Sequence, residues 1–318
     1  MLNVVRVHRF QLSLVVAAAC WGGARVISKR AVDEIDPLTL LPLELTVSVA
    51  VLAVAMLVRR ERVGWSPEMR RLSTLGVLNP GLAYALSLAG LARVDASVSV
   101  LLWALEPVLI LGIAFVVLRE GVAMPIALCA GAALAGVVLV VFQPGHASAL
   151  GIMLTIAGVA ACAIYTVLSS RYLIEATTVS VVFVQQVTAL LFALVLLAGS
   201  LVLSDPASLA GVSATAWASA MVAGALYYGI AFWFYLAGLR GVTASVAGLF
   251  INLVPVFGIT ASYIVLGERL SPRQWIGALI VIGAIAAAAL LVGREAAAEH
   301  EAIPANSDNS FAIESRDL

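Results

Sequence analysis

The chain contains one long apolar unit twice, and this repeat limits its possible folds more than any other feature. Residues 94–120 read VDASVSVLLWALEPVLILGIAFVVLRE, and residues 242–268 read VTASVAGLFINLVPVFGITASYIVLGE. One copy lies on the other with a shift of 148 residues and no gap, and Pro107 then matches Pro255. In membrane proteins, a doubled hydrophobic unit with proline-interrupted helices at matching positions indicates a transporter with its site between two halves.

The composition places this repeat in a membrane. Of the 318 residues, 63% are hydrophobic and 11% are charged, and the mean hydropathy is +1.08. A soluble domain carries about a quarter charged residues, so we predict a polytopic membrane protein. The formal net charge of zero argues against nucleic acid as a partner. Cys20, Cys129 and Cys162 all lie in apolar runs, which predicts neither a disulfide framework nor a metal site.

Ten apolar stretches are long enough to cross a membrane as helices, which takes about 20 residues. They cover roughly residues 10–28, 37–58, 72–92, 95–118, 124–142, 149–170, 178–203, 212–239, 243–266 and 274–292. Each copy of the repeat then holds five helices. Because five is an odd number, the two copies must insert with opposite orientations. We therefore predict an all-α fold of ten transmembrane helices in two inverted five-helix repeats.

This count divides the chain into four parts. They are a cytoplasmic N-terminus (1–9), a first repeat (10–142), a second repeat (149–293) and a disordered cytoplasmic tail (294–318). Arginines near the helix ends gather on one side, five of them between residues 59 and 71. Because basic loops stay in the cytoplasm, we expect a multi-pass protein of the inner membrane with both termini cytoplasmic.

Polar side chains at membrane depth are the candidates for chemistry, because their burial there is costly. Glu106 lies near the centre of the fourth stretch, directly before Pro107, which should kink the helix. Helical spacing places Ser99, Trp103 and Glu106 on one face. We therefore expect Glu106 to bind a cationic or amine group, or to take up a proton.

Other polar residues in the apolar stretches leave alternatives open. Glu44 is a second group that could titrate, and Asn252 in the second copy can donate and accept hydrogen bonds. For both Glu44 and Glu106, the alternative is an ion pair with Arg25 or Lys29. We group Glu44, Arg25 and Lys29 as structural or gating residues. Asn252 is a candidate for substrate binding or for contact between helices.

Aromatic side chains fall within or near the stretches that should form the core. They are Trp21, Tyr84, Trp103, Tyr165, Tyr227, Tyr228, Phe232 and Trp233. Their faces could hold a planar or cationic ligand, although packing is the alternative. With Glu106, Ser99 and Asn252, the aromatic residues chosen as substrate-binding candidates are Trp21, Tyr84, Trp103, Tyr165 and Tyr228.

Catalytic groups and cofactor motifs are missing. The three histidines lie outside the apolar stretches, and no cluster of side chains has the spacing of metal ligands. Glycine motifs that bind phosphate are absent as well. We predict no catalytic residue, no metal, no cofactor and no enzymatic activity.

The doubled pattern resembles the EamA-type transporters of the drug/metabolite transporter superfamily. The matching residues are Ala96, Ser97, Pro107 and Glu120 with Ala244, Ser245, Pro255 and Glu268. The resemblance covers residues 10 to about 293. It implies a ten-helix basket in which helices 1, 3, 4, 6, 8 and 9 surround a cavity while helices 5 and 10 pack to the side. It also implies structural, gating or capping roles for the two prolines and the two glutamates.

The resemblance further implies transport of amino acids, metabolites, amines or drugs. We expect export of a small organic solute by alternating access, coupled to protons through Glu106. The alternative is a membrane-embedded enzyme or flippase that acts on a lipid or an isoprenoid-linked substrate. The expected partners are the solute and membrane lipids, and a homodimer is left open.

Overall fold

The chain is helical through most of the residues that the structure describes. A computed structural model describes residues 2–118, 124–141, 148–169, 178–203, 209–239, 250 and 253–302. Its elements are α1 Leu2–Val32, α2 Pro37–Arg59, α3 Pro67–Thr74, η1 Leu75–Val77, η2 Leu78–Leu82, α4 Ala83–Leu91, α5 Ala96–Trp103, α6 Glu106–Leu118, α7 Met124–Val141, α8 Ala149–Ser169, α9 Thr178–Leu203, α10 Ala214–Gly224, η3 Ala225–Ile230, α11 Ala231–Leu239, α13 Val254–Ala261, η4 Ser262–Leu266 and α14 Pro272–Ala302. Two predicted site residues, Glu120 and Asn252, lie outside the described residues.

Within the described residues, six helical segments are long and apolar enough to cross a membrane. They are Arg9–Val32, Pro37–Arg59, Pro67–Leu91, Ala149–Ser169, Val179–Leu203 and Ala214–Tyr235. Shorter apolar helices occupy the other predicted stretches, at Ala96–Ile110, Met124–Val140, Val254–Leu266 and Pro272–Ala288. The fold is thus an all-helical polytopic arrangement, while the count of ten spans stays a prediction.

Short polar signals before proline set where helices begin. The Asp36 side chain accepts a hydrogen bond of 2.9 Å from Leu38 N, and Ser66 Oγ accepts one of 3.1 Å from Met69 N. In each case a proline stands at the start of the helix, where its missing N–H leaves no hydrogen bond unmade.

The last helix is longer than the sequence predicted. We expected a disordered tail from residue 294, whereas α14 continues to Ala302. Residues 294–302 read REAAAEHEA, and alanine and glutamate are among the strongest helix formers. The first helix likewise begins at Leu2, ahead of the predicted start at residue 10.

The two copies of the repeat break their helices at the same places. α5 ends at Trp103 and α6 begins at Glu106, so the chain turns directly before Pro107. α6 spans the same positions as Val254–Leu266 in the second copy, 148 residues later. α4 and α11 also begin and end 148 residues apart. The similarity between the copies therefore extends from residue types to helix boundaries.

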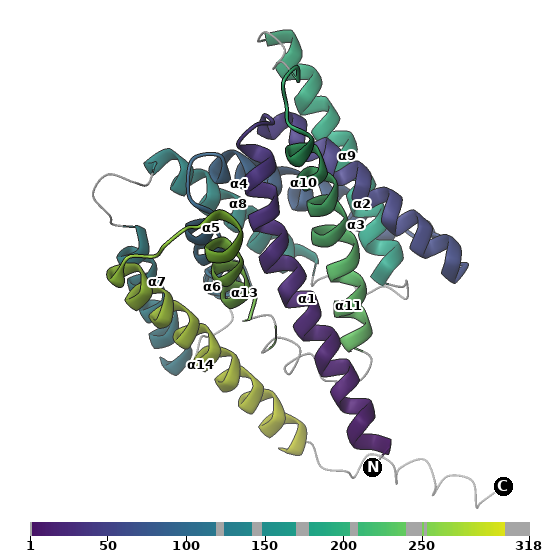
Figure 1. Ribbon diagram of the computed structural model, residues 1–318. Helices are drawn as coiled ribbons and strands as arrows, with labels where there is room; N and C mark the ends of the chain where they lie inside the picture. The colour runs from purple at the N-terminus through teal and green to yellow at the C-terminus, as the bar shows by residue number, and fades with distance from the viewer. Residues whose placement is uncertain are drawn as a thin grey trace, which may run out of the picture.

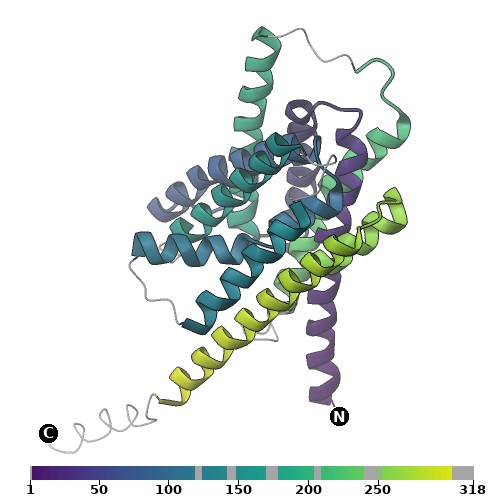
Figure 2. The ribbon, with the colours of Figure 1, turned by 90° about the vertical axis from the view of Figure 1, so that its left-hand side faces the viewer.

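The helices pack in pairs that relate the copies to each other. α7 packs along α14, and these two helices lie side by side in both views (Figures 1 and 2). α2 packs on α9. α1 packs on α10 and α11, and correspondingly α8 packs on α4. α1 begins and α14 ends at the same end of the molecule (Figures 1 and 2).

Glycine allows α7 and α14 to approach closely. A Cβ added at Gly277 would lie 2.6 Å from Gly136 O, and one added at Gly136 would lie 2.8 Å from Gly277 O. Small residues at such crossings are typical of membrane helices. Gly131 and Gly283, in contrast, have no atom within 4 Å of an added Cβ. Of these four glycines, only Gly136 and Gly277 therefore lie in this contact.

We predict that Gly277→Leu destabilises the protein by roughly 1–3 kcal/mol, the usual cost of overpacking a close contact. The matched control is Gly283→Leu on the same helix, where the added side chain meets open space. The measurement is the midpoint of thermal unfolding of the purified variants in detergent. Equal midpoints for the two variants would contradict the close contact.

Candidate functional site

A buried arginine lies at the centre of the candidate site. Arg25 on α1 is only 5% exposed. Its Nη1 donates a hydrogen bond of 2.7 Å to Ser87 Oγ on α4, and its Nη2 donates one of 2.8 Å to Tyr227 Oη on η3. The guanidinium carbon lies 4.7 Å from the centre of the Trp103 ring. One charged group thus contacts elements from both copies of the repeat.

Aromatic rings surround this guanidinium. Tyr84 stacks on Trp103 with ring centres 5.4 Å apart, and it meets Tyr227 and Tyr228 edge-on at 5.3 and 5.2 Å. Trp103 Nε1 donates to Ser87 Oγ at 2.8 Å, and the Tyr84 and Tyr227 hydroxyls lie 3.2 Å apart. We call Arg25, Tyr84, Ser87, Trp103, Tyr227 and Tyr228 the arginine–aromatic cluster.

Glu44 borders this cluster on α2. Its side chain is 2% exposed and accepts a hydrogen bond of 2.6 Å from Ser28 Oγ. Arg25, Ser28 and Glu44 line a small recess of about 10 Å³ together with Tyr84, Leu88, Leu91, Tyr227 and Tyr228. A cavity of this size holds one water molecule at most. The recess is therefore polar but closed to an organic solute in this conformation.

Glu106 lies at the start of α6 and does not line the recess that contains Glu44. Its Oε1 accepts a hydrogen bond of 3.2 Å from Cys162 Sγ on α8. Cys162 packs in a small apolar cluster against Tyr84 and Trp103. Glu106 is partly exposed, unlike Glu44.

The ion pairs considered from the sequence do not form. Among the described residues, the ion pairs within 4 Å are Lys29–Asp33 and Arg59–Glu61. Arg25 and Lys29 therefore make no ion pair with Glu44 or Glu106. Arg25 and Glu44 nevertheless line the same recess.

The other predicted residues lie around the cluster or away from it. Trp21 Nε1 donates to the backbone oxygen of Tyr227 at 3.0 Å, next to the cluster. The Tyr165 hydroxyl donates instead to Gln185 Oε1 at 2.8 Å, which joins α8 to α9. Ser99 is fully buried, and its hydroxyl has no partner among the described residues. The structure thus gathers Trp103, Tyr84 and Tyr228 around Arg25 and leaves Tyr165 outside.

Sequence reasoning missed four side chains. Ser28, Ser87 and Cys162 were not candidates, and Tyr227 was named among the aromatic residues but not chosen for substrate binding. Serine and cysteine are small enough to be common on any membrane helix, so their residue type carries no signal. Their roles follow from tertiary contacts with Glu44, Arg25 and Glu106.

A larger cavity is apolar and separate from these groups. It has a volume of about 230 Å³ and is lined by side chains of α2, α9, η3 and α11, including Leu52, Val182 and Trp233. None of the predicted site residues lines it.

Comparison with known proteins decides the family. A model of the EamA-like transporter family matches residues 9–142 and again residues 149–290. The chain belongs to the EamA-like transporter family. Members of this family are transporters of the drug/metabolite transporter superfamily.

Two individual proteins are similar to this EamA-like chain. A protein of Archaeoglobus fulgidus named "uncharacterized transporter" is 24% identical over 276 residues, which are 85% of this chain and 94% of the relative. A solved crystal structure has a TM-score of 0.64 at 19% identity and covers 90% of this chain and 98% of its own. The structural likeness shows a shared fold.

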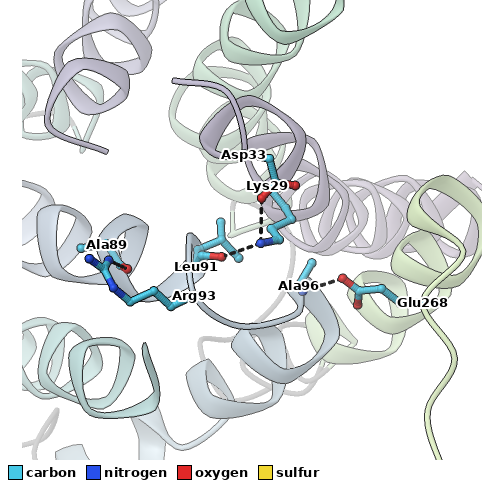
Figure 3. Close-up of polar contacts among 7 residues, drawn as sticks. All are labelled: Lys29, Asp33, Ala89, Leu91, Arg93, Ala96 and Glu268. Carbon is cyan, nitrogen blue, oxygen red and sulfur yellow. Dashed lines mark hydrogen bonds and ion pairs between the residues drawn. The ribbon is translucent and has the colours of Figure 1, made fainter. Parts of the chain in front are cut away.

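Polar contacts join neighbouring elements around Lys29 and Ala96 (Figure 3). Glu268 follows η4 and accepts hydrogen bonds from the first backbone N–H groups of α5, Ala96 N at 2.7 Å and Ser97 N at 2.9 Å. Lys29, near the end of α1, pairs with Asp33 at 2.9 Å and donates to Leu91 O at 3.0 Å (Figure 3). Glu268 therefore joins the second copy to the first (Figure 3).

Glu34 adds a third contact near the same end of α1. Its carboxylate accepts from Ser213 N at 2.7 Å and from Ser213 Oγ at 2.8 Å, ahead of α10. These hydrogen bonds, the backbone one first, hold the pKa of Glu34 below its usual value. This contact also crosses from the first copy of the repeat to the second.

We predict that Glu268→Ala destabilises the protein by about 0.5–2 kcal/mol, as expected when the acceptor for N-terminal helix N–H groups is lost. Glu268→Gln keeps one acceptor oxygen and should fall between Glu268→Ala and wild type. Arg269→Ala, at the exposed neighbouring position, is the control. Thermal unfolding in detergent measures the effect, and equal losses for Glu268→Ala and Arg269→Ala would refute the capping role.

Proposed function

We propose that this chain is a secondary transporter that exports a small organic solute, such as an amino acid, an amine or a metabolite, across the inner membrane. The arginine–aromatic cluster is the observation that supports this proposal most. It places a charge, four hydroxyl groups and aromatic faces between α1, α4, α5 and η3. Buried polar groups at membrane depth are rare and mark substrate pathways.

Alternating access of two inverted repeats is the proposed mechanism. The matching helix boundaries and the paired packing of α1 on α11 and α8 on α4 support it. In such transporters the site lies between the repeats, and one repeat rocks against the other around it. The common end for the start of α1 and the end of α14 supports two termini on one side, here proposed as the cytoplasm.

The proposed substrate-binding residues are those predicted from the sequence. Trp103, Tyr84 and Tyr228 belong to the cluster, Trp21 adjoins it, and Ser99 lies on the same helix as Trp103. Tyr165 and Asn252 complete the proposal. Aromatic faces of this kind can hold a cationic or planar solute.

Glu106 is proposed as the proton-coupling residue. Its only described polar contact is with a thiol, a weak donor, so a proton or an amine can compete for the carboxylate.

We predict that Glu106→Gln abolishes flux driven by a pH gradient and leaves the protein folded, because an amide cannot exchange the proton. Purified protein in liposomes is screened with pooled amino acids, amines and sugars, with and without an imposed gradient. Glu68→Gln, a partly exposed carboxylate on α3, is the matched control.

The outcomes separate the parts of this proposal. Unchanged gradient-driven flux in Glu106→Gln would remove the coupling role. Flux that ignores the gradient in wild type would indicate a facilitator. No flux of any pooled solute would move the function toward a lipid or isoprenoid-linked substrate, the alternative drawn from the sequence.

A further inference from the structure

The Arg25 guanidinium lacks a counter-ion at contact distance. It is 5% exposed, and no described carboxylate oxygen lies within 4 Å of it. Arginine stays charged at any pH that a protein meets, so burial cannot neutralise it. A buried charge without a paired charge costs several kcal/mol. A residue of purely structural use at this position would not need that charge.

Most hydrogen-bonding capacity of Arg25 is unused. A guanidinium has five N–H donors in a planar fork. Within the described part of the chain, two hydrogen bonds use them, and both go to neutral hydroxyl oxygens, those of Ser87 and Tyr227. The fork matches the two oxygens of a carboxylate, which bind it more strongly than hydroxyls do.

The two hydroxyl oxygens that accept hydrogen bonds from Arg25 would each keep another hydrogen-bond partner if Arg25 turned to a ligand. Ser87 Oγ also accepts from Trp103 Nε1 at 2.8 Å, and the Tyr227 hydroxyl also lies 3.2 Å from the Tyr84 hydroxyl. Leaving a buried polar group unpaired usually makes such an exchange unfavourable. Here an incoming anion could take the guanidinium while Ser87 and Tyr227 each keep a partner.

The surroundings favour a ligand with one negative charge and an apolar body. Glu44 lines the same recess as Arg25, so a dianion such as phosphate would meet stronger repulsion from its carboxylate than a monoanion would. The walls of the site are the rings of Trp103, Tyr84 and Tyr227. The recess of about 10 Å³ beside Arg25 must widen to admit such a ligand, by movement of the tyrosines that line it.

We propose that Arg25 binds the carboxylate of the transported solute, so that the substrates are organic acids, amino acids included, rather than simple amines. The inference rests on the proposed transport function and narrows its substrate class. It assigns to Arg25 a specificity-determining contact in place of the structural or gating role expected from the sequence.

The test compares ligands that differ only in the carboxylate. The probes are the twenty proteinogenic amino acids, the corresponding amines without a carboxylate, the corresponding acids without an ammonium group, and inorganic phosphate. Binding is measured as thermal stabilisation of the purified full-length protein in detergent, over a range of probe concentrations. The variants are Arg25→Lys, which keeps the charge but loses the fork, and Arg93→Lys, an exposed arginine, as the control.

The expected result is that probes with a carboxylate stabilise the wild type and Arg93→Lys. Arg25→Lys should bind them about tenfold more weakly or worse, as expected from the loss of a charged hydrogen bond. The decisive measure is the ratio of affinities for an acid and for its matching amine, which should fall in Arg25→Lys alone. A merely structural role would lower both affinities together.

Several results would overturn the inference. They are stabilisation by phosphate alone, equal binding of acids and amines by the wild type, an unchanged acid-to-amine ratio in Arg25→Lys, and no stabilisation by any probe. Liposome flux separates this failure from failure of the proposed function. If amines are transported but no carboxylate binds, the transport proposal stands and the proposed role of Arg25 is wrong. If carboxylates bind in a way that depends on Arg25 but no solute is transported, the Arg25 site stands and the transport proposal is wrong.

Discussion

The burial of one permanent charge constrains how the helices can be arranged. Arg25 lies within the apolar span Arg9–Val32. A charged side chain that faces lipid is costly, so the Arg25 side chain must contact polar or aromatic partners inside the protein. Those partners come from α4, α5 and η3, and only the last belongs to the second copy of the repeat. α1 therefore cannot rotate about its axis without separating Arg25 from all of them.

The scaffold repeats, but the site does not. In the 148-residue register, Tyr84 and Ser87 correspond to Phe232 and Tyr235, and Trp103 and Glu106 correspond to Ile251 and Val254. The helix boundaries match between the copies, while the side chains of the site differ from their counterparts. Symmetric packing can thus serve the movement of two similar halves, and an asymmetric site can bind a solute whose two ends differ.

Local features of the fold could be predicted from the sequence, and pairings between distant residues could not. Apolar stretches, proline breaks and the Ser–Pro start of α3 depend on neighbours in the chain, and the structure has them. The face proposed for Ser99, Trp103 and Glu106 assumed one continuous helix, whereas the chain turns at Ala104 and Leu105. The Arg25–Ser87 contact joins residues 62 positions apart, and charge alone had suggested carboxylate partners instead.

Several polar contacts lie near the end of α1. Glu268 caps α5 and Glu34 binds Ser213, so these two contacts join the copies of the repeat, while Lys29 binds Leu91 O within the first copy. Each such hydrogen bond adds only about 0.5–1.5 kcal/mol net, or somewhat more where a charge takes part. Because these contacts are individually weak, they can separate without any helix unfolding.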